Sequence, residues 1–352
     1  MRSYEEIFAA FGGLSLPGEQ DQVEVDWVVP ERLAIGRDAS ARYVLVLAGD
    51  RVFATSDIVR RSLVHGDWQS SSDTIKGTLL RVPQGEQFHI ASTTIAIELL
   101  RRGIETRPTP DVFSEVEAFI ELVIRRVLLP PDAIIGLLGE LIVLDYAIDA
   151  WGKLAPEERP DVCSIWRGYS RQSRDFAFHR LAMEVKTTTG PSSRHHIGGL
   201  DQVEPRVLDG GLTEELFLVS VGIAEASAGS SRFSIAGLTS RIVEKLTEHD
   251  AVRFLDQLEQ YGPEDCVGYC HDSMADWGPY LQRYRLTFEP RVYNMADPLL
   301  RLIKRADLQD TCVLPEGISY QVHLPDVVPG SHGRNPRTDL PQALLQLFNS
   351  HS

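Results

Sequence analysis

The chain has 352 residues, of which 43% are apolar, so it is long enough to bury a sizeable core and to divide into two or three folded units. Its formal net charge of −15 argues against a protein that coats nucleic acid by bulk electrostatics, but not against one basic groove on an acidic body. No run of about 18 uncharged apolar residues occurs, and acids stand near the start where a signal peptide would be basic. We therefore expect a cytoplasmic protein with no membrane association.

The first part of the chain, residues 1–110, is expected to be a β-rich N-terminal domain. Gly, Pro and Asp separate short runs that favour strands, and one helical run interrupts them near the end. The predicted strands are 22–29, 32–37, 42–54 with a Gly-Asp turn, and 78–83; the predicted helix is 93–103.

Residues 111–225 are expected to be the core domain, which opens with two helices separated by Pro130 and Pro131. The second helix has Asp132 as its expected N-cap and repeats apolar residues at i, i+3 and i+4, so it should lie against a core. The predicted elements are helices 111–129 and 132–152, two short strands within 174–190, a short helix within 195–205 and a strand over 215–224.

Residues 226–352 are expected to form a C-terminal α/β region. A helix is predicted over 238–262 with Gly262 as its C-cap, and strands are predicted over 280–295 and 317–328. The segment 331–342 is polar and rich in turn residues, so we expect the tail to be loosely held.

Cysteine usage fits a reducing compartment, because four cysteines are too few for a disulfide framework in a chain of this size. Cys266, Cys270 and His271 have the residue types of a zinc site. Their spacing and the shortage of further cysteines favour buried free thiols instead.

The stretch RDFAFHRLAMEVKTTTG, residues 174–190, places three charges inside two apolar strands. If His179 and Arg180 form a two-residue turn, the strands pair as a hairpin, with Asp175 opposite Glu184. Because strand side chains alternate, one face is then large and apolar, while the other carries Asp175, Glu184 and Lys186 beside small alanines.

Two carboxylates about 5 Å apart on one sheet face repel each other and need a positive charge between them. A hard divalent cation such as Mg²⁺ suits an Asp and Glu pair, and Lys186 on the same face can orient or activate the water that attacks a phosphodiester. Only five of the 35 basic residues are lysines, which gives this lysine added weight.

The signature Asp175, Glu184-x-Lys186 resembles that of the PD-(D/E)XK nuclease superfamily, which has the restriction-endonuclease-like fold. The ordered flanks LLGELIVL, Trp166-x-Gly168, RDFAF, EVKTTT, HHIGGLDQVEP and LPEGISYQVHL resemble a bacterial family of PD-(D/E)XK motif proteins found in restriction and phage-defence gene clusters. The core of the likeness covers about residues 130–225. Asp175 lacks the preceding proline of the superfamily's name.

The resemblance implies an α/β fold: a mixed β-sheet flanked by helices, between the β-rich N-terminal unit and the α/β C-terminal unit. It implies that Asp175 and Glu184 bind Mg²⁺, with Mn²⁺ as a substitute, that the Val185 carbonyl adds a ligand, and that Lys186 serves the nucleophilic water. Glu140 would be the acid contributed by the preceding helix, where Gly136 and Gly139 allow close backbone approach. Gln202 would have an auxiliary role.

Plainer interpretations of the remaining residues stay open. Glu140 can be a solvent-side helix residue, and Gln202 can be a polar residue on a short amphipathic helix. His195 and His196 are expected in a solvated loop rather than at a phosphate. Two explanations remain for the three consecutive threonines Thr187, Thr188 and Thr189. They can line a cleft, or they can be present because threonine favours strands.

Two functions from different classes compete, and a hydrolase that acts on RNA or nucleotides is a third, weaker interpretation. The first is a metal-dependent DNA endonuclease of a restriction or phage-defence system; the second is a catalytically silent subunit that uses the same fold to bind nucleic acid or to scaffold a defence complex. Family likeness suggests ATPases and a DNA methyltransferase as operon partners. Cutting both strands takes two active sites, which makes a homodimer the natural assembly.

Overall fold

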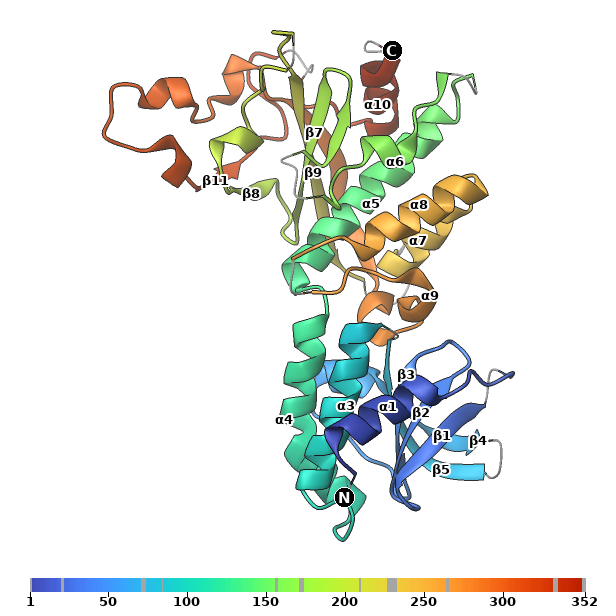
Figure 1. Ribbon diagram of the computed structural model, residues 1–352. Helices are drawn as coiled ribbons and strands as arrows, with labels where there is room; N and C mark the ends of the chain where they lie inside the picture. The colour runs from blue at the N-terminus through green and yellow to red at the C-terminus, as the bar shows by residue number, and fades with distance from the viewer. Residues whose placement is uncertain are drawn as a thin grey trace. The chain divides into compact units, whose positions relative to one another are not determined.

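The computed structural model describes residues 2–19, 22–70, 74–83, 85–155, 158–170, 174–208, 210–226, 233–263, 266–331 and 335–349. Its contacts divide the chain into two compact units, each with its own sheet (Figure 1). Unit 1 is Met1–Pro130 with Gly262–Leu281, and unit 2 is Pro131–Tyr261 with Gln282–Ser352.

Unit 1 is built on a five-stranded antiparallel sheet in the order β1-β2-β3-β5-β4. Its strands are β1 (Val23–Val29), β2 (Leu33–Asp38), β3 (Tyr43–Ala48), β4 (Leu63–Gln69) and β5 (Thr74–Val82). Its helices are α1 (Tyr4–Gly13), α2 (Asp57–Arg61), α3 (Glu86–Arg101), α4 (Thr109–Val127), α9 (His271–Met274) and the 3₁₀ helix η3 (Gly278–Leu281).

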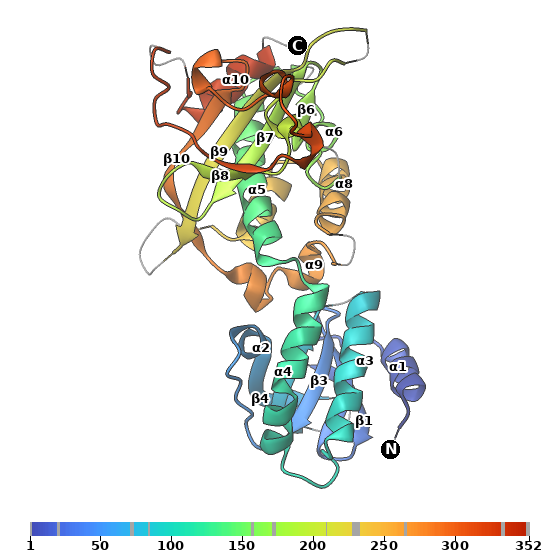
Figure 2. The ribbon, with the colours of Figure 1, turned by 90° about the vertical axis from the view of Figure 1, so that its left-hand side faces the viewer.

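Helices α3 and α4 lie across this sheet (Figure 2). The central strand β3 is buried along its whole length, as expected for a strand covered on both faces. On one face, Val44 and Val46 of β3 pack with Trp68 and Ile75. The N-terminal part of the chain is therefore a sheet with its own core and helical cover.

Unit 2 is built on a mixed four-stranded sheet in the order β10-β9-β7-β6, in which only β7 and β9 are parallel. A two-stranded sheet of β8 and β11 accompanies it. The strands are β6 (Phe176–Phe178), β7 (Leu181–Thr188), β8 (Arg194–Ile197), β9 (Glu215–Glu225), β10 (Tyr284–Asn294) and β11 (Tyr320–His323).

The helices of unit 2 flank this sheet, and α5 packs on β7 as well as on α7 and α10. The α-helices are α5 (Pro131–Trp151), α6 (Val162–Ile165), α7 (Ile235–Val243), α8 (Glu248–Glu259) and α10 (Leu340–Asn349). The 3₁₀ helices are η2 (Leu200–Gln202), η4 (Pro298–Leu300), η5 (Arg305–Leu308) and η6 (Pro315–Gly317). The mixed sheet flanked by helices agrees with the expected α/β class.

Several predicted elements differ in extent. The predicted strand over 42–54 ends at Ala48, and α1 and β4 were not predicted at all. The predicted helix over 238–262 is two helices, because the Thr247 hydroxyl accepts a hydrogen bond from Asp250 N and starts α8. Helix α5 begins at Pro131, so Asp132 is not its N-cap, and α8 has Gln260 rather than Gly262 as its C-cap.

The prediction of a loosely held tail is wrong for its described part, and residues 332–334 lie outside the described residues. Asn335 is buried, and helix α10 buries Leu344, Leu347 and Phe348. The Phe348 ring lies 4.6 Å from that of Trp151 on α5. An amphipathic helix follows the polar turn segment, and its apolar face ties the tail to unit 2.

The expected domains 1–110, 111–225 and 226–352 stay a prediction. By contacts, α4 and residues 262–281 lie with the N-terminal strands in unit 1, whereas the rest of the expected core and C-terminal domains shares unit 2. Among the described helices, none is both long and apolar enough to cross a membrane. None of the four cysteines is in a disulfide, and Cys266 and Cys270, which were expected to be buried thiols, are only half-buried.

Candidate active site

The hairpin of β6 and β7 has the register that its sequence predicts. His179 takes a positive φ of 50° in the two-residue turn, a conformation that such turns require although Gly and Asn adopt it more readily. The pairs are Phe176 with Met183, Ala177 with Ala182, and Phe178 with Leu181. The hairpin therefore brings Asp175 beside the end of the Glu-Val-Lys triplet.

Asp175 itself does not join the ladder, which ends at Phe176 and Met183. The chain bends at Asp175, whose N–H donates to the Met183 carbonyl at 3.1 Å. Its carboxylate accepts the Val185 N–H at 2.6 Å. The expected strand pairing of Asp175 with Glu184 is thus replaced by a side-chain bond that holds the carboxylate against β7.

The face of β7 that carries the charges is less open than expected. Ala182, at its start, is covered by Ile197 of β8 and Val322 of β11, so apolar residues pack on both faces there. Glu184 is only 5% exposed. Its Oε1 lies 2.8 Å from Nζ of Lys186. The charged patch is therefore confined to the part of β7 that follows Met183.

Glu140 enters the site from α5 and is 5% exposed, so its interpretation as a solvent-side residue is wrong. Trp166 donates its indole N–H to Oε2 at 2.8 Å, and Tyr261 donates its hydroxyl to Oε1 at 2.7 Å. A Cβ at Gly168 would lie 1.6 Å from Oε2. These three neighbours enclose the carboxylate and fix its orientation.

The expected role of the α5 glycines is confirmed by their contacts. A Cβ at Gly139 would lie 1.9 Å from Oγ1 of Thr187 on β7, and one at Gly136 would lie 3.1 Å from the Tyr261 hydroxyl. Only glycine at 139 lets the helix approach the strand this closely. Thr187 therefore packs under α5, and β propensity is not its sole explanation.

The three carboxyl groups lie in one electrostatic cluster. Burial raises the pKa of Glu140 to about 7, and the charge of Glu184 adds to the shift. Burial raises the pKa of Asp175 well above its usual range, with further contributions from Glu140 and Glu184. Burial also raises the pKa of Glu184, while Lys186 opposes the shift. One ammonium does not balance the three acids of this cluster, of which Glu140 and Glu184 are buried.

This imbalance fits a divalent cation, which would relieve both the repulsion and the loss of hydration. The three acids do not form a preformed ring of ligands. Among the described residues, the group whose ligand atoms all lie within 4.8 Å of one another is Asp161, Cys163 and Asp250. Mg²⁺ commonly uses one or two carboxylates with waters and phosphate oxygens, so the acids beside Lys186 remain suitable.

The group of Asp161, Cys163 and Asp250 has a simpler explanation. Asp161 caps α6 by accepting the Cys163 N–H at 3.0 Å and pairs with Arg253. Asp250 accepts a hydrogen bond from Thr247 at the start of α8. Burial raises the pKa of the Cys163 thiol to about 11, which opposes its use as a thiolate ligand. Helix capping accounts for the cluster.

Gln202 stands in the short helix η2, and its side-chain oxygen accepts the Gly198 N–H at 2.8 Å. That bond is local and does not join Gln202 to the acids. The segment is nevertheless tied to the site by Arg174, which donates to the carbonyls of Asp201 at 2.5 Å and Glu204 at 2.9 Å. The auxiliary role of Gln202 stays a prediction.

Arg174 is a site residue that the sequence did not reveal. It is 4% exposed, immediately precedes Asp175, and pairs with the equally buried Glu214 at 2.6 Å. Its charge also opposes the rise in the pKa of Glu184. Because Glu214 is 40 residues away, no local pattern indicates this pair.

His195 is buried on β8, so its expected place in a solvated loop is wrong; His196 is exposed on the same strand. Nε2 of His195 lies 2.7 Å from Oγ of Ser220, and the Ser220 hydroxyl donates to Oγ of Ser193 at 2.9 Å. Ser220 is the β9 partner of Lys186. Burial, with a contribution from Lys186, lowers the pKa of His195 to about 4. A neutral imidazole therefore covers the strand beside Lys186.

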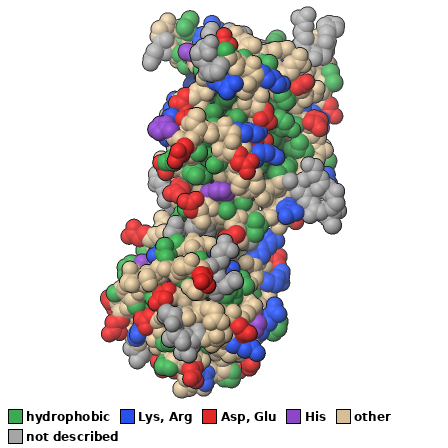
Figure 3. All heavy atoms as spheres, turned by 90° about the vertical axis from the view of Figure 1, so that its right-hand side faces the viewer, with side chains coloured by type: hydrophobic (Ala, Val, Ile, Leu, Met, Phe, Trp, Pro, Cys, Tyr) green, Lys and Arg blue, Asp and Glu red, His purple; other side chains and the backbone are tan. Residues whose placement is uncertain are grey.

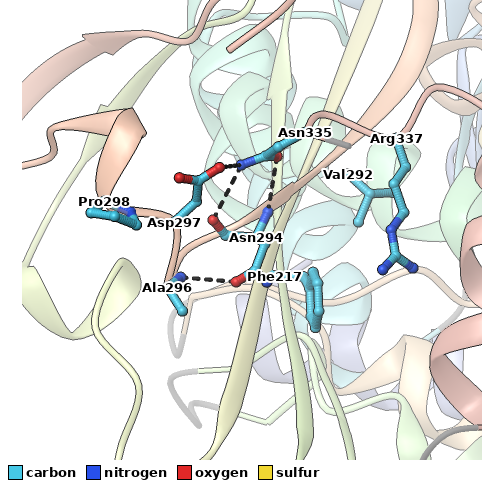
Figure 4. Close-up of a pocket in the computed structure, with 8 residues that line it drawn as sticks. All are labelled: Phe217, Val292, Asn294, Ala296, Asp297, Pro298, Asn335 and Arg337. Atoms are coloured by element: carbon cyan, nitrogen blue, oxygen red, sulfur yellow. Dashed lines mark hydrogen bonds between the residues drawn. The ribbon is translucent and has the colours of Figure 1, made fainter. Parts of the chain in front are cut away.

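A separate hollow of about 430 Å³ lies where β9 and β10 meet the tail (Figure 4). The amide of Asn335, one of the lining residues, donates to Asp297 at 3.0 Å and accepts from Asn294 N at 3.2 Å. Arg337 stands over the Phe217 ring. The asparagine and aspartate groups satisfy one another, and none of the predicted site residues lines the hollow.

One family of known proteins matches residues 5–266 and is described as "Putative PD-(D/E)XK family member, (DUF4420)". The chain belongs to this family. The matched range contains all the predicted site residues of this PD-(D/E)XK family member, together with Tyr261 and most of unit 1. No curated protein and no solved structure matches the chain.

Membership in the PD-(D/E)XK family agrees with the mixed sheet and with the position of Asp175, Glu184 and Lys186 on its hairpin. PD-(D/E)XK folds are usually nucleases and generally use divalent metals. The family and the fold therefore both indicate a nuclease-like chain.

Proposed function

We propose that this chain is a metal-dependent DNA endonuclease, a phosphodiester hydrolase, of a bacterial restriction or phage-defence system. The observation that carries the proposal is the gathering of Glu140, Asp175 and Glu184 around Lys186 in one largely buried cluster. Buried acids with raised pKa values beside a single lysine are costly for folding and useful for chemistry. Their repulsion supports a site that is completed by a cation.

In this proposal Asp175, Glu184, Glu140 and the Val185 carbonyl hold Mg²⁺, and Mn²⁺ can replace it. When bound, the metal supplies Lewis acidity toward the phosphoryl group and the attacking water. Lys186 donates a hydrogen bond that orients the water. The water oxygen would form a bond to phosphorus as one phosphorus–oxygen ester bond breaks, and the proton that the water gives up would balance the one that the leaving oxygen takes up.

The Val185 main chain links two of these roles. Its N–H holds the Asp175 carboxylate at 2.6 Å, so Asp175 is positioned before any metal arrives. Glu140 is held in the same way by Trp166 and Tyr261. Preorganised acids lose little freedom on binding a metal, which favours affinity.

The test is cleavage of supercoiled plasmid DNA by purified protein in Mg²⁺ or Mn²⁺. Lys186→Ala and Asp175→Ala should lower the rate about 100-fold or more, the loss typical of a removed catalytic group. Lys153→Ala, which changes an exposed lysine in the same unit, should cut normally. If protein assayed with its operon partners never cleaves DNA in either metal, the proposal is wrong.

The alternative is a catalytically silent subunit that binds nucleic acid or scaffolds a defence complex. Two observations favour it: Glu140 already accepts a hydrogen bond at each oxygen, and Lys186 is paired with Glu184. Thermal unfolding in increasing Mn²⁺ separates the two functions. The endonuclease predicts a metal-dependent rise in melting temperature that Glu184→Ala abolishes, and the silent subunit predicts none.

Partners remain part of the proposal. Family resemblance supports ATPases and a DNA methyltransferase from the same operon, and geometry supports a homodimer for cutting both strands. Co-purification with the operon products and light scattering of the isolated chain test these two points separately.

A further inference from the structure

The backbone of Arg167 borders the candidate active site, and the residue has no role in the proposal above. It stands between Trp166, which donates to Glu140, and Gly168, whose Cα packs against the same carboxylate. Trp166 bridges to Phe176, and the Arg167 N–H donates to the Asp175 carbonyl at 2.7 Å. The backbone of Arg167 is thus bonded directly to the residue that carries the catalytic carboxylate.

Within the described residues, the side chain of Arg167 forms no hydrogen bond and no ion pair. Its Nε is shielded from solvent and has no hydrogen-bond partner, and no carboxylate of the described residues forms an ion pair with its guanidinium. The residue as a whole is half-buried. Arg174, seven positions along the chain, differs in this respect. Its guanidinium donates hydrogen bonds to Glu214 and to two backbone carbonyls.

The Nε of Arg167 is a shielded donor in a chain whose 50 acidic residues outnumber its 35 basic ones. A shielded donor without an acceptor is destabilising, so such a group calls for an explanation such as a ligand. Acidic and basic side chains are mixed on the face shown in Figure 3 rather than gathered in one broad basic surface.

We infer that Arg167 binds a phosphate oxygen of the substrate strand, at or next to the phosphodiester that is cut. The inference rests on the proposed function. In it, Arg167 is the group that holds the anionic substrate beside the three acids. A guanidinium suits the task because its planar fork donates two parallel hydrogen bonds to a phosphate. The acids repel DNA, and Arg167 supplies attraction at the point where that repulsion is greatest.

Affinity for DNA in Ca²⁺ is the first measurement, by fluorescence anisotropy with labelled duplex and single-stranded oligonucleotides over a range of salt. Arg167→Met keeps the apolar stem and removes the charge. It should weaken duplex binding about tenfold or more, the effect of losing a charged hydrogen bond. It should also reduce the slope of log affinity against log salt by about 0.9, because one phosphate contact is lost.

Arg167→Lys should keep the salt slope but recover only part of the affinity, because the charge remains and the fork is lost. Arg180→Met is the matched control. It removes an exposed arginine at the turn of the same hairpin, at the end away from Asp175, and should leave both affinity and slope unchanged.

Thermal unfolding in EDTA without DNA separates this role from a structural one. Because Arg167→Met deletes an unpaired buried N–H, the melting temperature should stay the same or rise; a structural role requires it to fall. If the wild type cuts DNA and Arg167→Met keeps the affinity and salt slope of the wild type, the inference about Arg167 is wrong and the proposed function stands. A wild type with no affinity for either oligonucleotide overturns it together with the proposed function.

Discussion

Glu140→Gln should stabilise the metal-free protein at alkaline pH. The pKa of Glu140 lies at about 7 instead of 4.5, so the folded chain binds a proton that the unfolded chain releases between these pH values. The stability that this proton contributes is complete below about pH 4.5 and is lost as the pH rises through about 7. Above that pH the folded protein retains an unfavourable buried charge.

The size of the effect follows from the shift. A tenfold change in an equilibrium is worth about 1.4 kcal/mol, so raising the pKa from 4.5 to about 7 corresponds to about 3 kcal/mol. Glutamine removes this term without breaking the contacts. Its oxygen can accept from Trp166, and its amide can donate to Tyr261, because a tyrosine hydroxyl also accepts.

The assay is urea unfolding in EDTA at pH 5.5, 7 and 8.5, followed by tryptophan fluorescence. The gain of Glu140→Gln over the wild type should increase with pH, approaching about 3 kcal/mol at the highest value. Glu259→Gln, an exposed change on α8, is the control and should show no such trend. A constant loss of stability in Glu140→Gln at all three pH values would refute the reasoning.

The other predictions concern the surroundings of the acids. Gly168→Ala places a Cβ 1.6 Å from the Glu140 carboxylate, so it should cost about 1–3 kcal/mol in urea unfolding and weaken Mn²⁺ binding in a calorimetric titration. Glu214→Gln removes the carboxylate that pairs with the buried Arg174 and should cost about 3–5 kcal/mol, whereas the exposed Glu215→Gln should cost little; equal losses would contradict the assignment. Affinity for Mn²⁺ should rise from pH 6 to pH 8, because Glu140 must lose its proton to bind, and a flat profile would exclude it as a ligand.

The position of the candidate site could be predicted from the sequence because the hairpin is local. Alternating residues and a two-residue turn determine which strand positions meet, and the observed pairs are the predicted ones. The same holds for Gly139, whose missing side chain indicates close packing before the partner is known. The predicted strand pairing of Asp175 with Glu184 was wrong. The chain bends at Asp175, and its carboxylate accepts the Val185 N–H in place of a backbone bond between strands.

Only the tertiary structure decided what surrounds the charges. The hydrogen-bond donors to Glu140 come from positions 26 and 121 residues away, and the anion that pairs with Arg174 is 40 residues away. His195 is buried because β11, more than 100 residues later, pairs with its strand. Sequence alone therefore determined the chemical groups of this site through local periodicity, and long-range packing determined their burial and their partners.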